Sequence, residues 1–348
     1  NNTAVGYNAL AHNTTGSENT AIGTDTLKAN TTAANNVAVG YYSAQANTTG
    51  TQNVSMGTYS FDANTTGSNN TALGYSALGS NTTAGTNVAV GHQAMLDNTT
   101  VGNNTTAAGN FAAGYKALED CTVGHSNAAS GAYALFNVTD GDLNTAHGYG
   151  AGSQVTTGIQ NTLVGASAGD AVSTGSNNTI IGYNSDTNSG AGGSRIGLGA
   201  GLTLTTNNQT MIGVGSNFVT NTFVTNATWT HSSDARLKEK VEDDVLGLSF
   251  INDLRPVTYN WKSQADVPEV IRGTHEKDTD ARMHGMLAQD IKTALDTAGV
   301  DTFLGWSEQP NGTQMISEGM FVYPLVKAVQ ELSTALDAAL ARIATLEG

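Results

Sequence analysis

A short motif of polar and apolar residues recurs through the first half of the chain at a fixed step. It reads Asn-x-small-x-Gly, and successive copies begin 17 residues apart. One interval, between Asn87 and Asn110, is 23 residues long and holds six extra residues. The asparagines that open the copies are Asn2, Asn19, Asn36, Asn53, Asn70, Asn87, Asn110, Asn127, Asn144, Asn161 and Asn178. Such a repeat indicates a solenoid, in which each copy forms one coil stacked on the next.

The residue types inside each copy predict a parallel β-roll. The second residue after the Asn is small in nine of the eleven copies, which lets the walls of a narrow coil approach each other. The Gly that closes the motif suits a tight corner with a positive φ angle. A further apolar residue usually follows four positions later, as at Leu10, Leu27, Phe61, Leu78, Met95, Leu118 and Leu135. We expect the stacked Asn side chains to form a hydrogen-bonded ladder, and coils ~4.8 Å apart would build a rod of roughly 50 Å.

Asn-Thr-Thr triplets separate many copies of the motif, and two interpretations of them stay open. We expect the triplets to form the polar outer turn of each coil. They also match the N-glycosylation sequon, and on that interpretation their asparagines would carry sugars at the surface.

The period breaks after residue 187, where the composition also changes. Residues 188–231 become Gly-rich and then rich in Thr and Val, and the run 218–224 mixes β-branched and aromatic residues with polar ones. This pattern predicts strands. We therefore divide the chain into a β-roll repeat domain over 1–187, a β-rich neck over 188–233 and a C-terminal α+β domain over 234–348.

Apolar residues at alternating steps of three and four predict a coiled coil over 322–347. Before it, we expect a helix over 287–298 and short strands over 257–261 and 303–306. A helix that packs its apolar face on its own domain is the alternative to the coiled coil. The seam consists of Val322, Leu325, Val329, Leu332, Leu336, Ala339, Ile343 and Leu346.

Charge and composition exclude several classes of function. The formal net charge is −15, and residues 1–233 contain three basic residues against ten acidic ones. No basic stripe is present, so we expect no nucleic-acid partner. No apolar run reaches the ~18 residues of a membrane span, so we expect no membrane insertion. The chain does not begin with Met, and we expect a further segment before Asn1.

Other side chains of the repeat carry weaker signals. A lone cysteine, Cys121, excludes an intramolecular disulfide and a CxxC metal site, and we expect it to be a small buried residue. The repeat's histidines share no register, so we predict no metal, and we predict no cofactor; they are His12, His92, His125 and His147. Tyrosines either pack between repeats or stack on sugars if exposed, among them Tyr41, Tyr42, Tyr75 and Tyr115.

The segment 228–238, Thr-Trp-Thr-His-Ser-Ser-Asp-Ala-Arg-Leu-Lys, resembles the junction of endosialidase-type intramolecular chaperone domains, which end many phage tail fibres and spikes. Three downstream blocks, 254–262, 285–290 and 323–332, also match in the same order. The resemblance implies a domain that trimerises, guides the folding of the preceding fibre and is then cut off.

The resemblance also implies one self-cleavage in cis, between Ser233 and Asp234, by a dyad of Ser233 and Lys238. A serine hydroxyl becomes a nucleophile once a base takes its proton, and a buried lysine is such a base. Attack of Ser233 Oγ on its own carbonyl, followed by hydrolysis, would release a chain that begins at Asp234. Arg236 is either a supporting group or a structural salt-bridge partner, and Ser232 is an alternative nucleophile. An interpretation of Ser233 and Lys238 as linker residues also stays open.

The repeat resembles the heads of trimeric autotransporter adhesins, whose Asn-x-Ala-x-Gly pattern builds a trimeric left-handed β-roll. Each coil has few large apolar residues, so association of several chains is expected on physical grounds as well. Together the resemblances imply a homotrimeric tail fibre of a virion, made in the host cytoplasm. Its expected partners are a host cell-surface receptor, taken to be a glycan, and upstream fibre or virion proteins.

Three other functions stay open. A polysaccharide depolymerase would need a close carboxylate pair, for which Glu119 with Asp120 and Asp140 with Asp142 are candidates, although solvated acids in turns are the simpler interpretation. A bacterial surface adhesin would need a membrane anchor after the coil. A membrane-tethered transcription factor would need a basic DNA-binding module.

Overall fold

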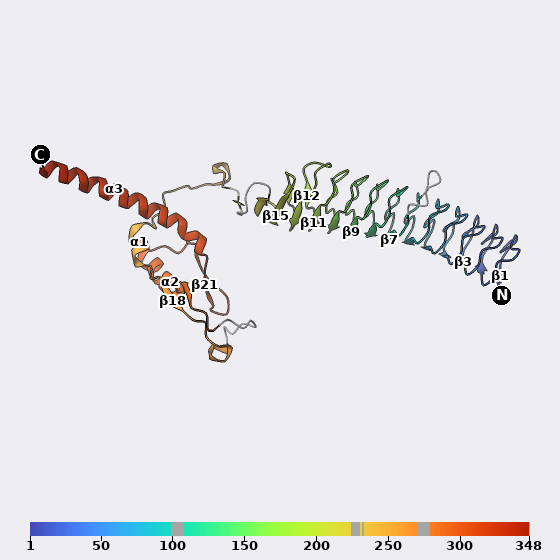
Figure 1. The fold of residues 1–348 in the computed structure, drawn as a ribbon, viewed down its shortest axis with the longest axis horizontal. Helices are drawn as coiled ribbons and strands as arrows, with labels where there is room; N and C mark the ends of the chain where they lie inside the picture. The colour runs from blue at the N-terminus through green and yellow to red at the C-terminus, as the bar shows by residue number, and fades with distance from the viewer. Residues whose placement is uncertain (99–107, 224–229, 232, 270–278, 348) are drawn as a thin grey trace. The chain divides into compact units, whose positions relative to one another are not determined.

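The computed structural model describes residues 1–98, 108–223, 230–231, 233–269 and 279–347. The chain divides into two compact units, Asn1–Ser233 and Asp234–Gly348 (Figure 1). The first unit is a parallel β-solenoid, and the second is a small α+β domain that ends in a long helix. The expected fold class is confirmed.

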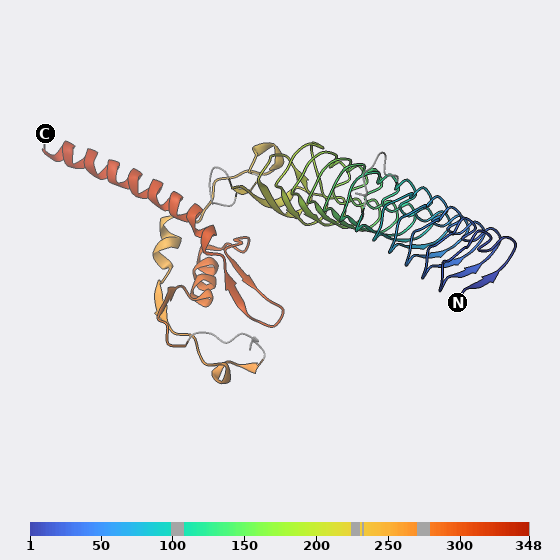
Figure 2. The same cartoon turned by 45° about the vertical axis from the view of Figure 1, so that its right-hand side comes forward.

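Each coil of the solenoid contributes one three-residue strand, which pairs in parallel with the strand 17 residues further on, as Thr3 pairs with Thr20. Figure 2 shows the coils stacked one behind another. The sheet keeps its register across the 23-residue interval, where Val88 lies opposite Phe111. The strands are β1 (Thr3–Val5), β2 (Thr20–Ile22), β3 (Val37–Val39), β4 (Val54–Met56), β5 (Thr71–Leu73), β6 (Val88–Val90), β7 (Phe111–Ala113), β8 (Ala128–Ser130), β9 (Thr145–His147), β10 (Thr162–Val164) and β11 (Thr179–Ile181).

The stack of parallel strands continues past the expected boundary at residue 187. β13 (Ile196–Leu198) pairs in parallel with β11, and β15 (Gln209–Val214) pairs with β13. Arg195 occupies the place of the motif Asn, and its backbone N–H donates to Asn178 Oδ1 at 3.2 Å. The step of 17 therefore persists to residue 195. The sequence pattern did not reveal this coil because it has Arg in place of the motif Asn.

The end of the first unit adds shorter strands and an antiparallel sheet segment. β12 (Asp186–Thr187) and β14 (Thr203–Leu204) pair in a small separate sheet. β16 (Asn217–Thr222) pairs antiparallel with β15, and β17 (Thr230–His231) with β16. The strand predicted over 218–224 corresponds to β16.

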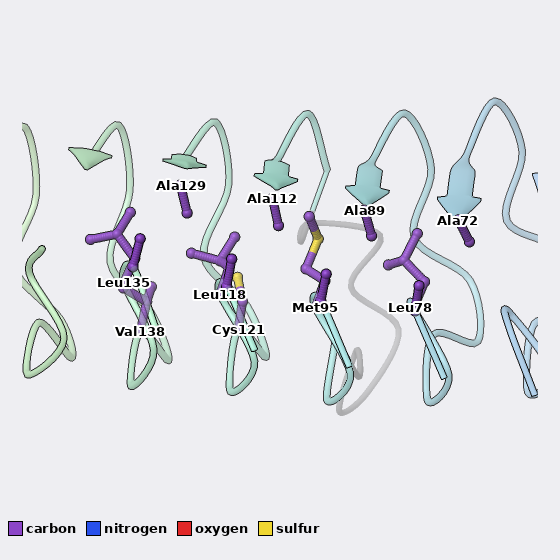
Figure 3. Packing of buried hydrophobic residues seen from close by; sticks show 14 of the residues in the cluster. Ala72, Leu78, Ala89, Met95, Ala112, Leu118, Cys121, Ala129, Leu135 and Val138 are labelled. Atoms are coloured by element: carbon purple, nitrogen blue, oxygen red, sulfur yellow. The ribbon is translucent and has the colours of Figure 1, made fainter. Parts of the chain in front are cut away.

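The two apolar positions of the repeat fill the interior of the coils. Strand alanines such as Ala89 and Ala112 are fully buried and point toward the large residues Met95 and Leu118 (Figure 3). The same arrangement recurs along the stack, with Phe61 as the largest fully buried side chain. The small residue on the strand thus leaves the space that the larger residue across the coil fills.

The expected asparagine ladder is present. Asn36 Oδ1 accepts a hydrogen bond from the Asn53 backbone N–H at 2.9 Å, and Asn36 Nδ2 donates to the Gly50 carbonyl at 2.9 Å. The side chain thereby satisfies backbone groups of the neighbouring coil and of its own coil. From Asn19 to Asn178 these asparagines are at most 2% exposed, so the ladder lies in the core.

The asparagines of the Asn-Thr-Thr triplets also face the interior, so the outer-turn prediction is wrong for them. Asn47, Asn64 and Asn81 are buried. Asn64 Nδ2 donates to Asn47 Oδ1 at 2.7 Å, and Asn81 Nδ2 donates to Asn64 Oδ1 at 3.0 Å. Burial likewise excludes glycosylation at these asparagines, because a buried amide cannot carry a sugar. This second ladder satisfies amide groups that would otherwise be costly to bury.

Cys121 takes the place of the triplet asparagine after the insertion. Its Sγ donates to the Gly124 carbonyl at 3.2 Å, as Asn64 Nδ2 does to the Gly67 carbonyl. Burial raises the pKa of the Cys121 thiol to about 12. The prediction of a small buried cysteine is confirmed.

The corner glycines give a testable stability prediction. Gly74 has φ +136°, and a Cβ added there would lie 2.4 Å from the Gly91 carbonyl oxygen of the next coil. We expect Gly74→Ala to lower the free energy of unfolding by roughly 1–3 kcal/mol, because a residue in a disfavoured backbone region costs about this much. Gly150 is the matched control, since it has φ +64° and its nearest neighbour would be 3.8 Å away. Gly150→Asn should leave the Tm nearly unchanged, and equal losses in both variants would refute the steric explanation.

A pH prediction follows from Asp186, which lies in β12. Its carboxylate accepts hydrogen bonds from the backbone N–H groups of Ala171 and Thr187, and burial together with Asp170 raises the pKa of Asp186 to about 7. An acid with a raised folded pKa stabilises the fold at low pH and loses this contribution as the pH rises from 3.8 to about 7. We expect Asp186→Asn to remove this part of the pH dependence, measured by denaturant unfolding at pH 5 and pH 8. Identical pH slopes in both proteins would contradict it.

The second unit packs short helices and two antiparallel pairs of strands around a small core. β18 pairs antiparallel with β19, and β20 pairs antiparallel with β21. The core comprises Leu246, Phe250, Ile291, Ala294, Leu295 and Phe321. The elements are η1 (Ala235–Leu237), α1 (Leu248–Asp253), β18 (Val257–Tyr259), η2 (Gln264–Asp266), β19 (Met283–Gly285), α2 (Ala288–Ala298), β20 (Trp306–Glu308), β21 (Gln314–Ile316), η4 (Glu318–Phe321) and α3 (Val322–Glu347). The predicted helix is α2, and the predicted strand over 257–261 contains β18, whereas the strand expected from 303 begins only at Trp306.

The predicted seam lies on α3, a helix of 26 residues. The N-terminal part of α3 packs against α1 and buries Pro324 and Ala328. The large seam residues nevertheless remain 47–81% exposed. The alternative of a helix packed on its own domain therefore does not hold for the seam, which lacks a covering surface in the described part of one chain.

Candidate cleavage site

The bond between Ser233 and Asp234 joins the two compact units. Residues 233–245 are exposed, so this link is open to solvent. Thr230 and His231 belong to β17 just before it. Ser232, the alternative nucleophile, lies outside the described residues, as do Thr228 and Trp229.

Asp234 begins η1 and is held by Arg236. Asp234 Oδ1 accepts a hydrogen bond from the Arg236 backbone N–H at 2.9 Å, and the Arg236 Nε donates to the two carboxylate oxygens at 3.0 and 3.1 Å. The guanidinium holds the pKa of Asp234 below its usual value. Arg236 was expected to be either a supporting group in cleavage or a structural salt-bridge partner, and the single chain shows the salt bridge. Because both side chains are exposed, this ion pair contributes little to stability.

Lys238 closes the same short helix. Its backbone N–H donates to the Ala235 carbonyl at 3.1 Å, and the residue is exposed. One helical turn thus separates Asp234 from Lys238. A lysine acts as a base where burial lowers its pKa, and one chain, in its described part, does not bury Lys238.

The downstream sequence blocks make contacts within the second unit. The Arg255 guanidinium donates to Asp290 Oδ2 at 2.8 and 3.0 Å, which ties the block 254–262 to the block 285–290. Glu331 Oε2 from α3 accepts from the Leu248 backbone N–H at 2.7 Å at the start of α1. Arg255, Asp290 and Glu331 belong to the matching blocks, but the sequence did not identify their partners.

Glu331 can approach α1 because residue 247 is a glycine. A Cβ at Gly247 would lie 2.4 Å from Glu331 Oε1. The glycine therefore leaves space for the carboxylate that caps α1. Pattern matching alone missed Gly247, because it lies outside the matching blocks.

One acid of each carboxylate pair considered for a depolymerase already has a partner. Glu119 is buried, not solvated as expected, and its Oε1 contacts Lys116 Nζ at 2.9 Å. Asp142 accepts from the His125 backbone N–H at 2.9 Å and lies 3.3 Å from its imidazole. Asp140 is exposed in a turn. These contacts give each pair an acid that is already partnered, which argues against a catalytic carboxylate couple.

The described residues offer neither a metal centre nor a membrane span. Among them, no group of three or more His, Cys, Asp or Glu side chains is placed to hold a metal ion. No helix in the described ranges is both long and apolar enough to cross a membrane.

Comparison with known families supports the motif. Residues 233–300 match the family described as chaperone of endosialidase. The match begins at Ser233, includes Asp234 and Lys238, and ends shortly after α2, so it covers part of the second unit. The resemblance expected from the sequence is confirmed over this range. No curated protein and no solved structure matched the chain.

Proposed function

We propose that the second unit is an intramolecular chaperone of the tail-fibre type, which aligns three chains, promotes folding of the solenoid and is released by cleavage between Ser233 and Asp234. One observation carries the proposal: the family match begins at Ser233, and the second compact unit begins at Asp234. The family segment and the independently packed domain therefore start at the same bond.

The exposed seam of α3 supports the self-association. A helix of 26 residues is ~39 Å long at 1.5 Å per residue, which accommodates more than three heptads. Apolar a and d residues that water surrounds in one chain become buried when helices associate as a coiled coil. Three strands are taken from the family resemblance.

The solenoid offers a second surface for association. The last residue of each three-residue strand points away from the coil interior, and many of these residues are apolar. They form a row along the outer face of the sheet, which exposes Val5, Ile22, Met56, Val90, Ile181, Leu198 and Ile212. The row is interrupted in the middle of the stack, where β7, β8 and β9 end in Ala113, Ser130 and His147. Apolar patches on either side of this interruption mark an interaction surface, and we assign them to contacts between copies of the chain.

The reaction is net hydrolysis of one peptide bond. The C–N bond between Ser233 and Asp234 breaks, water supplies the hydroxyl, and the products are a Ser233 carboxylate and an Asp234 amine. Attack of Ser233 Oγ on its own carbonyl closes a strained four-membered ring. Attack by the Ser233 hydroxyl of a neighbouring chain avoids this ring, and the same dyad chemistry allows it. Lys238 takes the proton of the hydroxyl in either case.

Assembly would couple folding to the cut. Lys238 needs a buried environment to act as a base, and its exposure in one chain is consistent with burial by the other chains. Only correctly assembled trimers would then lose the chaperone, and its loss would leave the fibre kinetically trapped. Register needs such control because near-identical repeats specify it weakly.

Intact-mass spectrometry and light scattering of the freshly expressed chain test this function. We expect fragments 1–233 and 234–348, with the solenoid fragment trimeric. A monomer that stays intact would refute the proposal.

A further inference from the structure

A row of aromatic rings runs along the solenoid at the corner after the motif glycine. We call it the aromatic ladder; it consists of Tyr41, Tyr59, Tyr75, His92, Tyr115, Tyr133 and Tyr149, one ring from each of seven consecutive coils. The centroid distances between successive rings are 5.5, 6.1, 5.0, 5.4, 5.3 and 5.9 Å. At ~4.8 Å per coil the ladder is roughly 30 Å long.

The ladder remains continuous because two sequence positions supply its rings. Five of the rings directly follow the corner Gly. Two coils have Thr58 or Ala132 at that position, and there the next residue, Tyr59 or Tyr133, supplies the ring. Continuity therefore does not result from simple copying of one repeat.

The two substitute tyrosines have an unfavourable backbone conformation. Tyr59 has φ 56° and Tyr133 has φ 60°, in the left-handed region that costs ordinary residues roughly 1–2 kcal/mol. The same position has a positive φ in other coils, where it holds Asn8, Asp25 and Asn184 but also Tyr42, Gln93 and Lys116. The stack therefore tolerates ordinary side chains there. What Tyr59 and Tyr133 add is continuity, because each ring lies 5.3–6.1 Å from the rings of both neighbouring coils.

Stacking leaves much of the ladder in contact with water. Tyr41, Tyr75, Tyr115 and Tyr149 remain 42–61% exposed. Tyrosine offers both a flat apolar face and a hydroxyl group. A ladder of such rings presents apolar surface and hydrogen-bonding groups together, whereas the outer face of the sheet presents mainly aliphatic surface. This difference separates the ladder from the row assigned to contacts between chains.

The charge around the ladder restricts its partner. The first unit holds ten acidic and three basic residues, so it repels anionic polymers. Lys116 lies 5.9 Å from the Tyr115 ring centroid but is paired with Glu119 at 2.9 Å. A partner for this surface should therefore be uncharged, flat enough on one face to stack on rings, rich in hydroxyl groups and periodic along its length.

We propose that the aromatic ladder binds a linear, uncharged polysaccharide laid along the solenoid axis. Sugar rings would stack on the tyrosines, and sugar hydroxyls would bond to phenol and carboxylate oxygens. The inference goes beyond the proposed chaperone function and gives a binding surface to the glycan receptor expected from the sequence. It does not depend on cleavage, so each proposal fails or holds separately.

Fold-compatible variants test the ladder. Tyr59→Asn and Tyr133→Asn place an amino acid that tolerates the left-handed region at each position, so they should fold at least as well as the wild type. The probes are immobilised dextran, mannan, galactan and β-glucan, with polysialic acid as the anionic comparison. We expect the wild-type chain to bind at least one uncharged polymer and the double variant to bind it about tenfold more weakly or worse, as for lost stacking contacts.

Tyrosines outside the ladder provide the matched control. Tyr7 and Tyr183 also follow a corner glycine and are exposed. The double variant Tyr7→Ala, Tyr183→Ala should bind the same polymer as well as the wild type does. All variants should cleave and assemble normally. A loss of polysaccharide binding can therefore be told apart from a failure of the chaperone. If the wild type bound none of the uncharged polymers, or if the ladder variant bound as well as the wild type, the proposal would be overturned and the rings would serve only to stack between coils.

Discussion

Ser233→Ala is expected to leave the chain as one intact polypeptide of 348 residues. The substitution removes the hydroxyl that we propose attacks the peptide bond, and the loss of a catalytic nucleophile lowers rates by roughly 10³-fold or more. Lys238→Ala should have the same result, because the hydroxyl then lacks its base. Intact-mass spectrometry of freshly expressed protein measures both directly. The wild type beside them should give the fragments 1–233 and 234–348.

Two further variants show whether the loss is specific. Ser232→Ala should cleave normally, whereas a block at this variant would transfer the nucleophile to Ser232. Arg236→Ala removes an exposed salt bridge and should slow cleavage only modestly. The uncleaved Ser233→Ala protein should still be trimeric. If it cleaved at the wild-type rate, Ser233 would revert to a linker residue and the dyad would be refuted.

Mixed assemblies distinguish attack within a chain from attack between chains. Co-expression of Ser233→Ala chains with Lys238→Ala chains brings one intact serine and one intact lysine together only across a chain boundary. Strict action in cis predicts no cleavage in these mixtures. Cleavage of part of the material would place the two groups of the dyad on neighbouring chains.

The solenoid was predictable because its determinants are local and repeated. The ladder Asn, the small strand residue and the corner Gly each perform one task inside a single coil, so their spacing was visible in the sequence. The triplet asparagines were misassigned because polarity alone does not tell an inward amide from an outward one. Asn64 is buried at little cost because its amide bonds to Gly67 of its own coil and also donates to Asn47 of the neighbouring coil. The contact with Asn47 exists only after the coils stack.

Other features depended on exceptions to the repeat. Arg195 continues the step of 17 without the motif residue, so the end of the stack was placed too early. Tyr59 and Tyr133 continue the aromatic ladder from a neighbouring position, which the spacing of the motif did not reveal. At the cleavage site the sequence identified the residue types through a family resemblance. The proposed burial of Lys238 would arise only between assembled chains, and no pattern within one chain describes it.

Leu336→Asp combined with Ile343→Asp is expected to convert the assembly into monomers. Both residues belong to the exposed seam of α3, and a coiled coil buries such residues between helices, where an unpaired carboxylate is strongly disfavoured. Ala341→Asp is the matched control, because Ala341 is exposed on α3 but lies outside the seam. Light scattering should show a trimer for the control and a monomer for the double variant.

The same pair of variants tests whether cleavage requires assembly. If the other chains bury Lys238 and so make it a base, the monomeric double variant should remain uncut while the Ala341→Asp protein cleaves fully. Mass spectrometry at equal times after expression gives the comparison. A monomer that cleaves as fast as the control would contradict the coupling, because it would show that one chain alone builds the catalytic environment. The chaperone could then be lost before the chains were aligned, and cleavage would no longer report correct assembly of the fibre.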